Sequence, residues 1–244
     1  MTDDRDRTGN LILDALAKKD RGRLLRDAKE EPIEIGHVFY DPGDVLESVY
    51  LPTSGMVSVT TVDLDETSQV EMVTIGREGL FVAPALLGSD RLGQERYVGQ
   101  VAGTTLVVDK KMFASFVLQP GSLQDLVFGY LQALFADAGY GAACNARHHV
   151  EQRAARWLLD VHDRVDVDEF ELRQEFLAEM LAVQRQSVTI AAGTLQRAGF
   201  ITYTRGHMTI LDREGLENAA CECYEKIRSE YSRLVPLWAT NPPA

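Results

Sequence analysis

The sequence predicts an α+β protein with an antiparallel, jelly-roll-like β-roll first, one long helix next, and a C-terminal unit of short helices with a small hairpin. Three observations lead to this class. Apolar and polar residues alternate from Ile33 onward, as in strands. After Lys111 the pattern is helical for about fifty residues. Near the C-terminus, two short helical stretches are followed by a second alternating segment.

Length and charge limit the function. The chain has 244 residues, 45% of them hydrophobic, and a formal net charge of −12, so it does not coat DNA through bulk positive charge. Any contact with nucleic acid must be local. The apolar stretches are shorter than the roughly 20 residues of a membrane span, and the first ten residues, MTDDRDRTGN, are charged where a signal peptide is apolar. We expect a soluble, cytoplasmic protein with no membrane partner.

The first expected domain covers residues 1–118. Residues 10–29 have near-helical apolar spacing interrupted at Gly22, which predicts two short leader helices. Strand-like alternation follows, with breaks at Pro and Gly; its segments are 33–44, 48–63, 68–76 and 97–108. Short strands at this spacing are typical of a sandwich or roll.

Residues 119–149 are predicted as one long helix after the stop at Pro120-Gly121. Its apolar and small residues step by four and three, as in a coiled-coil seam that would pair two copies of the chain. The seam runs through Val127, Leu131, Leu134, Ala138, Gly141 and Asn145 toward His148. The alternative is a single helix buried on its own domain, which Phe128, Tyr130 and Phe135 would also satisfy. We interpret the helix as packing both on the roll and on a partner subunit.

The last expected domain covers residues 150–244. A helix over Val150–Val165 and a charged connector over Asp163–Glu171 precede two helical stretches, 174–181 and 184–198, joined by a very short link. The next segment alternates around Arg205-Gly206, a hairpin signal, and a final helix is expected over 213–232. Two short helices, a tight turn and a hairpin describe a winged helix-turn-helix, whose second helix lies in the DNA major groove.

Local charge agrees with a DNA-binding role. From Val183 to Leu211 the sequence has three arginines and no Asp or Glu, so this window is +3 whereas the rest of the chain is −15. The exposed side of the second helix would present residue types that read base edges, namely Arg185, Gln186 and Thr189. Ser187, Thr194 and Arg197 are candidates for phosphate contacts. Arg205 and His207 are candidates on the hairpin, where the tip reaches only backbone or minor groove.

Other chemistries have less support. Cys221-Glu-Cys223 has the form of half a zinc or iron–sulfur site, but no second Cys or His pair lies nearby in the sequence to complete it. We therefore expect reduced cysteines on a late helix and no metal site. His37 and the pair His148-His149 are candidate haem ligands by residue type alone. No nucleophile elbow, Gly-rich loop or HExxH motif is present, so we expect no enzyme and no cofactor.

In the order of its elements the chain resembles the Crp/Fnr superfamily of bacterial transcription regulators. The resemblance covers nearly the whole chain and is carried by the strings LPTSGMVSV, IGREGLFVAPALLG, QEFLAEMLAVQRQSVTIAAGTLQRAGFITYTRG and CECY. It implies that Arg185, Gln186 and Thr189 face bases, although the family commonly has Glu in place of Gln186. Arg173, Ala182 and Gln184 also depart from the usual capping and turn residues.

The resemblance also implies an effector pocket in the roll, but the residues that bind cyclic AMP in such proteins are not all present. Arg96 remains as a candidate for a phosphate. Val82 stands in a segment that supplies no carboxylate for a ribose, Tyr97 replaces a hydroxyl residue, and Ala138 lies where hydroxyls meet the adenine. We therefore expect weak or no binding of cyclic AMP, and a pocket that is either vestigial or built for a more apolar effector.

Together these features predict a homodimeric transcription regulator that binds a palindromic double-stranded DNA operator. RNA polymerase and an unidentified small-molecule effector are candidate further partners. The alternative is a cyclic-nucleotide-binding regulatory module that does not act through DNA, against which the acid-free arginine window argues.

Overall fold

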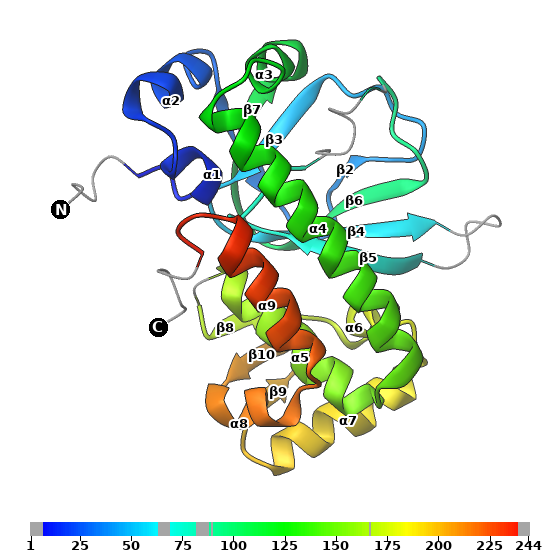
Figure 1. Cartoon of the computed structure of the whole chain (residues 1–244). Helices are drawn as coiled ribbons and strands as arrows, with labels where there is room; N and C mark the ends of the chain where they lie inside the picture. The colour runs from blue at the N-terminus through cyan, green and yellow to red at the C-terminus, as the bar shows by residue number, and fades with distance from the viewer. Residues whose placement is uncertain (1–6, 63–68, 82–87, 89, 166, 239–244) are drawn as a thin grey trace.

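The computed structural model of the protein describes residues 7–62, 69–81, 88, 90–165 and 167–238. A β-roll and a smaller helical unit lie at opposite ends of the molecule, and the long helix α4 (Ser122–Arg147) runs from one toward the other (Figure 1). This is the predicted α+β architecture. No helix in the described ranges is long and apolar enough to cross a membrane.

Two short leader helices precede the roll, as predicted, but the break lies elsewhere. Helix α1 (Leu11–Asp14) is capped by Asn10, and α2 covers Lys18–Leu24. Gly22 therefore lies within α2, and the chain breaks between the two helices instead. The side-chain amide of Asn10 also donates to the Pro52 and Gly79 carbonyl oxygens, so the cap of α1 is fixed by the roll itself.

The roll consists of two antiparallel sheets. One has the order β1-β7-β3 and the other β2-β6-β4-β5. Their bounds are β1 Lys29–Ile33, β2 Val38–Tyr40, β3 Ser48–Pro52, β4 Met56–Val62, β5 Gln69–Ile75, β6 Glu95–Val101 and β7 Gly103–Asp109. The single strand expected over 97–108 is thus two strands in different sheets. The chain changes sheet at Gly103, where a Cβ would lie 2.4 Å from the Ser54 carbonyl oxygen, so glycine permits a close approach that alternation cannot predict.

The C-terminal helix belongs to the core of the roll. Helix α3 (Lys110–Val117) leads into α4, and α9 (Cys223–Leu234) packs along α4 (Figure 1). Ile227 and Tyr231 of α9 lie in the same buried cluster as Val127 and Tyr130 of α4. The helix expected over 213–232 is therefore two helices, α8 (Arg213–Ala219) and α9. The second of them leaves the expected 150–244 domain and joins the N-terminal core.

The winged unit has its own core around Trp157 and Leu195. Helix α5 (Val150–Val165) packs against α7 (Arg185–Arg197), and α6 (Gln174–Met180) packs against α7 and against β5. The wing is a three-stranded sheet of order β8-β10-β9, with β8 Glu169–Glu171, β9 Ile201–Thr204 and β10 His207–Ile210. Strand β8 lies in the segment predicted only as a charged connector, because three residues with one apolar side chain give no alternation to detect.

A buried ionic network joins the two units. Arg164 of α5 is 1% exposed, and its guanidinium contacts Glu78 at 2.9 Å and Asp137 of α4 at 3.3 Å. Tyr231 of α9 donates to Asp137 at 3.2 Å, and the Arg164 guanidinium lies 5.3 Å from the centre of the Tyr231 ring. Side chains of the roll, α4 and α9 thus all contact one buried cation, which belongs to α5.

A second polar contact lies beside this network. Glu71 of β5 accepts hydrogen bonds from Trp157 Nε1 at 2.7 Å and Ser58 Oγ at 2.6 Å. Desolvation raises the pKa of Glu71 to about 7, and the two hydrogen bonds only partly offset it. The joint between roll and winged unit therefore contains the buried Arg164 network and, in Glu71, a carboxyl group whose pKa burial raises to about 7.

Candidate nucleic-acid interface and ligand pocket

The turn between α6 and α7 is the tight link predicted from the sequence. Ala182 adopts φ +49°, the left-handed conformation that a glycine adopts at lower cost, and the Val183 amide donates to the Ala178 carbonyl oxygen at 2.9 Å. Neither Arg173 nor Gln184 caps its helix with a side-chain hydrogen bond. The departures noted in the sequence thus leave the turn intact and remove the usual side-chain caps.

Helix α7 presents a polar face to solvent. Its buried side holds Val188, Ala191, Ala192 and Leu195, while Arg185, Gln186 and Thr189 are exposed as predicted. Arg185 forms an ion pair with Glu175 of α6 at 2.6 Å, and both side chains are more than half exposed. Thr189 Oγ1 lies 3.1 Å from Gln174 Oε1. These contacts hold the first turn of α7 in place without burying it.

The remaining predicted contacts lie along the same helix and on the wing. Thr194 and Arg197 are exposed, and Arg197 donates to the Thr194 hydroxyl at 3.1 Å; Ser187 is half-buried. Arg205 has φ +52° and Gly206 has φ +84° at the tip of the predicted hairpin, the backbone of a type I′ turn. The structure therefore places Arg205 on an exposed, sharply bent wing.

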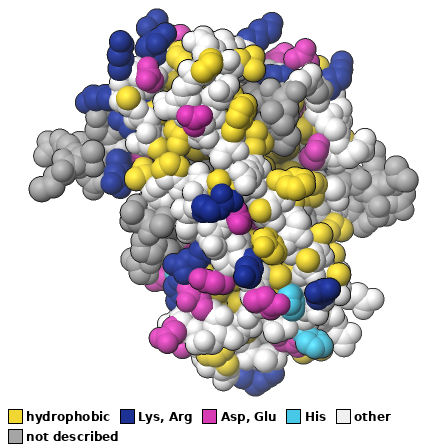
Figure 2. Space-filling view, in the orientation of Figure 1, with side chains coloured by type: hydrophobic (Ala, Val, Ile, Leu, Met, Phe, Trp, Pro, Cys, Tyr) yellow, Lys and Arg dark blue, Asp and Glu magenta, His cyan; other side chains and the backbone are white. Residues whose placement is uncertain are grey.

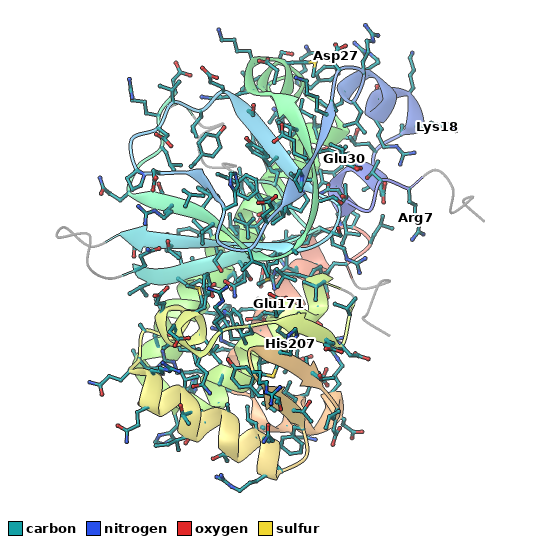
Figure 3. The ribbon with its side chains drawn as sticks, turned by 180° about the vertical axis from the view of Figure 1, so that it is seen from behind. Arg7, Lys18, Asp27, Glu30, Glu171 and His207 are labelled. Carbon is teal, nitrogen blue, oxygen red and sulfur yellow. The ribbon has the colours of Figure 1, made fainter. Side chains whose placement is uncertain are left out.

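His207 has an acidic neighbour. It pairs with Glu171 across the β10–β8 ladder, and the two side chains are labelled beside one another in Figure 3. Both are exposed. A carboxylate next to His207 opposes contact with a phosphate, so His207 is the weakest of the predicted DNA-contact positions.

A polar concavity of about 400 Å³ lies between the helix-turn-helix and the wing. It is lined by Arg173, Gln174, Glu175, Arg185, Tyr203, Arg205 and Gly206. In the sequence, Arg173 stands out only as an unusual cap residue. In the structure it joins Arg185 and Arg205, so three guanidinium groups border one concave surface. The feature of the sequence that could have indicated this position is the positive charge of Arg173 immediately before α6.

Helix α4 presents a different exposed face from the predicted seam. Val127 and Leu134 are buried in the core of their own chain, and Leu131, Ala138, Gly141 and Asn145 are half-buried. One position further along, Phe128 is 46% exposed and Phe135 is 83% exposed. In Figure 2, hydrophobic side chains gather along the course of α4 on this face. The seven-residue spacing is present, but the exposed residues, Phe128 and Phe135, each lie one position after the predicted Val127 and Leu134.

An apolar pocket of about 440 Å³ lies between the four-stranded sheet and α4. The side chains that line it are Val59, Met72, Val73, Ile75, Glu95, Tyr97, Leu131, Gln132, Leu134, Phe135 and Ala138. Two of the predicted pocket residues, Tyr97 and Ala138, meet here. Arg96 instead pairs with Asp41 at 2.5 Å, and Val82 lies outside the described residues. Of the candidate haem ligands, His37 packs edge-on against Phe39 in the roll.

Comparison with known proteins supports the predicted class. Residues 152–219 match the model of the Crp-like helix-turn-helix domain. No curated protein matches the chain. FixK2 from Bradyrhizobium japonicum is a structural neighbour with a TM-score of 0.67 and 15% identity, over 80% of this chain and 98% of that one.

Two further neighbours agree. A Crp/Fnr-family transcriptional regulator from Thermus thermophilus has a TM-score of 0.62 and 20% identity, over 79% of this chain and 98% of that chain. The c-di-GMP-responsive global regulator CLP from Xanthomonas campestris has a TM-score of 0.62 and 16% identity, over 80% of this chain and 99% of that chain. At these identities the likeness shows a shared fold. The predicted Crp/Fnr fold with its helix-turn-helix domain is confirmed.

Proposed function

We propose that this chain, which has the Crp/Fnr fold and carries a Crp-like helix-turn-helix domain, acts as a homodimeric regulator that binds an inverted-repeat DNA operator. One observation carries the proposal. The exposed face of α7 presents Arg185, Gln186 and Thr189 beside a concavity bordered by Arg173 and Arg205. Arginine and glutamine form bidentate hydrogen bonds with guanine and adenine edges in the major groove.

The pairing of Arg185 with Glu175 is compatible with DNA binding. Both side chains are more than half exposed, and surface ion pairs of this kind contribute at most about 1 kcal/mol. A guanine edge or a phosphate can therefore replace Glu175 at small cost. In the free protein the carboxylate holds the guanidinium over the first turn of α7, which lowers the entropy that is lost when Arg185 binds a base.

Dimerisation through α4 supplies the second recognition helix. The exposed line of Phe128 and Phe135 continues in small residues, Gly139, Ala142 and Ala146, which are also exposed. Two such faces pack closely across a two-fold axis, with large side chains at one end and close backbones at the other. We therefore place the proposed interface on this line and on the half-buried Leu131, Ala138, Gly141 and Asn145.

The pocket beside α4 favours an apolar effector. Its described lining offers only Glu95 and Gln132 as polar side chains, besides the hydroxyl of Tyr97, and the nearby Arg96 is paired with Asp41. A cyclic phosphate would be desolvated there without a free cation. Because Phe135 belongs both to the pocket and to the proposed interface, a bound effector would act directly on the dimer.

The proposal is tested by selecting genomic DNA fragments with the full-length protein, with cell extract added to supply any effector. Wild-type protein should enrich fragments that share an inverted repeat. Arg185→Ala should lose this preference at one base pair of each half-site, whereas the matched control Arg233→Ala, an exposed arginine on α9 paired with Glu230, should retain it. Enrichment of no fragment by the wild-type protein would contradict the proposal and favour a module that does not act through DNA.

A further inference from the structure

Three cysteines and one histidine from distant parts of the chain meet at the end of α4. Cys144 and His148 lie one helical turn apart there, and Cys221 and Cys223 flank the start of α9. The Sγ atoms of Cys144 and Cys221 are 3.4 Å apart, and His148 Nδ1 is 3.6 Å from Cys223 Sγ. All four potential ligand atoms lie within 4.8 Å of one another. We propose that they form a tetrahedral Zn²⁺ site of the Cys3His type.

The separations fit a single ion. With Zn–S bonds of about 2.3 Å and Zn–N bonds of about 2.0–2.1 Å, tetrahedral geometry separates two sulfur ligands by about 3.8 Å and a sulfur from a nitrogen by about 3.6 Å. The Cys144–Cys221 Sγ distance of 3.4 Å and the distance of 3.6 Å from Cys223 Sγ to His148 Nδ1 lie within a few tenths of an ångström of these values, and the remaining pairs of ligand atoms lie within 4.8 Å. A cluster of several iron atoms would hold its ligands farther apart. Three thiolates and an imidazole are also the donor types that zinc prefers.

The histidine is oriented as a metal ligand. While Nδ1 of His148 faces the cysteines, its Nε2 lies 3.3 Å from a carboxylate oxygen of Glu222. A carboxylate on the second ring nitrogen fixes the tautomer that leaves the first nitrogen free to bind metal. Glu222 stands between the two cysteines of the Cys221-Glu-Cys223 motif. The same short segment therefore supplies two ligands and orients a third.

The surroundings suit the charge of the occupied site. Three thiolates around Zn²⁺ carry a net charge of about −1. Arg153 and Arg156 of α5 interact electrostatically with Cys144, and the buried Nε atom of each has no hydrogen-bond partner among the described residues. Buried donors without acceptors are costly. Arg156 already pairs with Asp160, and thiolates at the site would add negative charge next to both guanidinium groups.

The position of the site gives it a structural consequence. Helix α4 ends at Arg147, His148 has an extended backbone, and α5 begins at Val150. A metal held by Cys144, His148, Cys221 and Cys223 would clamp this bend to the link between α8 and α9. It would thereby fix the direction in which α5 leaves α4. The metal site does not depend on the proposed function, because metal content is measured without DNA.

The first test uses the full chain, purified without a metal-binding tag. We expect about one zinc ion per chain by elemental analysis, retained after dialysis, and cysteine thiols that react with a disulfide reagent only after a chelator is added. Replacement by Co²⁺ should produce thiolate charge-transfer absorption and the visible bands of tetrahedral cobalt. A chain that takes up neither Zn²⁺ nor Co²⁺, or one isolated with a Cys144–Cys221 disulfide, would overturn the proposal.

Paired variants locate the ligands. His148→Asn should lower Zn²⁺ affinity at least about 100-fold, while His149→Asn, on the adjacent exposed residue, should leave it unchanged. Glu222→Gln should weaken Zn²⁺ binding about 10–100-fold, with the exposed Glu225→Gln as its control. Circular dichroism shows whether each variant is folded. Equal Zn²⁺ affinities of the folded His148→Asn and His149→Asn proteins would overturn the assignment of His148.

Discussion

The joint between roll and winged unit and the recognition surface of α7 both contain arginine–carboxylate pairs, but in opposite surroundings. Arg164 is 1% exposed and its partner Glu78 is fully buried, whereas the Arg185 and Glu175 side chains are 64% and 57% exposed. The Arg164 guanidinium also contacts Asp137 and lies over the rings of Tyr231 and Trp238. In the exposed pair, water competes with each side chain for hydrogen bonds to the other.

The difference indicates which contacts can change during function. Breaking a buried pair leaves an uncompensated charge and costs about 3–5 kcal/mol, whereas an exposed pair contributes at most about 1 kcal/mol. We therefore expect Arg164 to hold the two units together, and Arg185 to exchange its partner for DNA.

The largest effect is expected at the joint. Arg164→Met removes the cation that Glu78 and Asp137 share, so the free energy of unfolding should fall by about 3–5 kcal/mol. Urea denaturation followed by circular dichroism measures it. The control Arg233→Met removes an exposed ion pair and should cost less than about 1 kcal/mol. Similar losses in both variants would remove the distinction between buried and exposed pairs.

Dimerisation should be the next most sensitive property. Phe135→Asp places a charge on the exposed apolar line of α4 while leaving the core of the chain intact, because Phe135 is 83% exposed. Dimer affinity should fall about a hundredfold, or about 3 kcal/mol. Sedimentation velocity over a range of concentrations measures this. Leu118→Asp, at another exposed apolar residue, should have no effect, and an unchanged Phe135→Asp dimer would place the interface elsewhere.

Substitutions on the recognition surface should separate base from backbone contacts. Arg185→Ala should cost about 1–3 kcal/mol on the operator and little on scrambled DNA. Arg205→Ala, at the wing tip, should weaken binding to both sequences alike and flatten its salt dependence. Fluorescence anisotropy at two salt concentrations distinguishes the two patterns. Equal losses of Arg185→Ala on both duplexes would exclude direct base readout by this residue.

The smallest effect is a pH dependence of stability. Burial raises the pKa of Glu71 to about 7 from the ordinary value of 4.5, so the folded chain holds this proton more tightly than the unfolded chain. Proton binding by Glu71 therefore increases the free energy of unfolding. This increase is fully present below pH 4.5 and is lost as pH rises through 7. Because the side chain keeps some solvent contact, we expect a loss of about 1 kcal/mol. Glu71→Gln should reduce this slope in urea denaturation at pH 5 and pH 8; an unchanged slope would contradict it.

The sequence predicted the regular elements better than the sites between them. Helix Val150–Val165 and the hairpin at Arg205-Gly206 were correct because helical periodicity and turn residues are local signals. The seam predicted on α4 includes residues that the structure buries in their own chain, such as Val127, because apolar spacing does not distinguish them from residues left exposed, such as Phe128. Only packing decides between the two.

Sites assembled from distant segments were the hardest to predict. Cys144 and His148 precede Cys221 by more than seventy residues, so no short motif connects them, and the sequence alone predicts reduced cysteines without a metal. Arg173 joins Arg185 and Arg205 only through the fold of the winged unit. Tyr97 and Ala138 were placed at one pocket because the resemblance to a known family supplied the long-range arrangement that periodicity lacks.

The central proposal is that two copies of α7 read one operator, and footprinting on a selected fragment tests it most directly. Two recognition helices related by a two-fold axis should protect two half-sites about 34 Å apart, on one face of the duplex. Arg185→Ala should lose both protected segments at the same protein concentration, because the two half-sites are bound by identical subunits. A single protected segment, or uniform weak protection without a preferred sequence, would contradict the account.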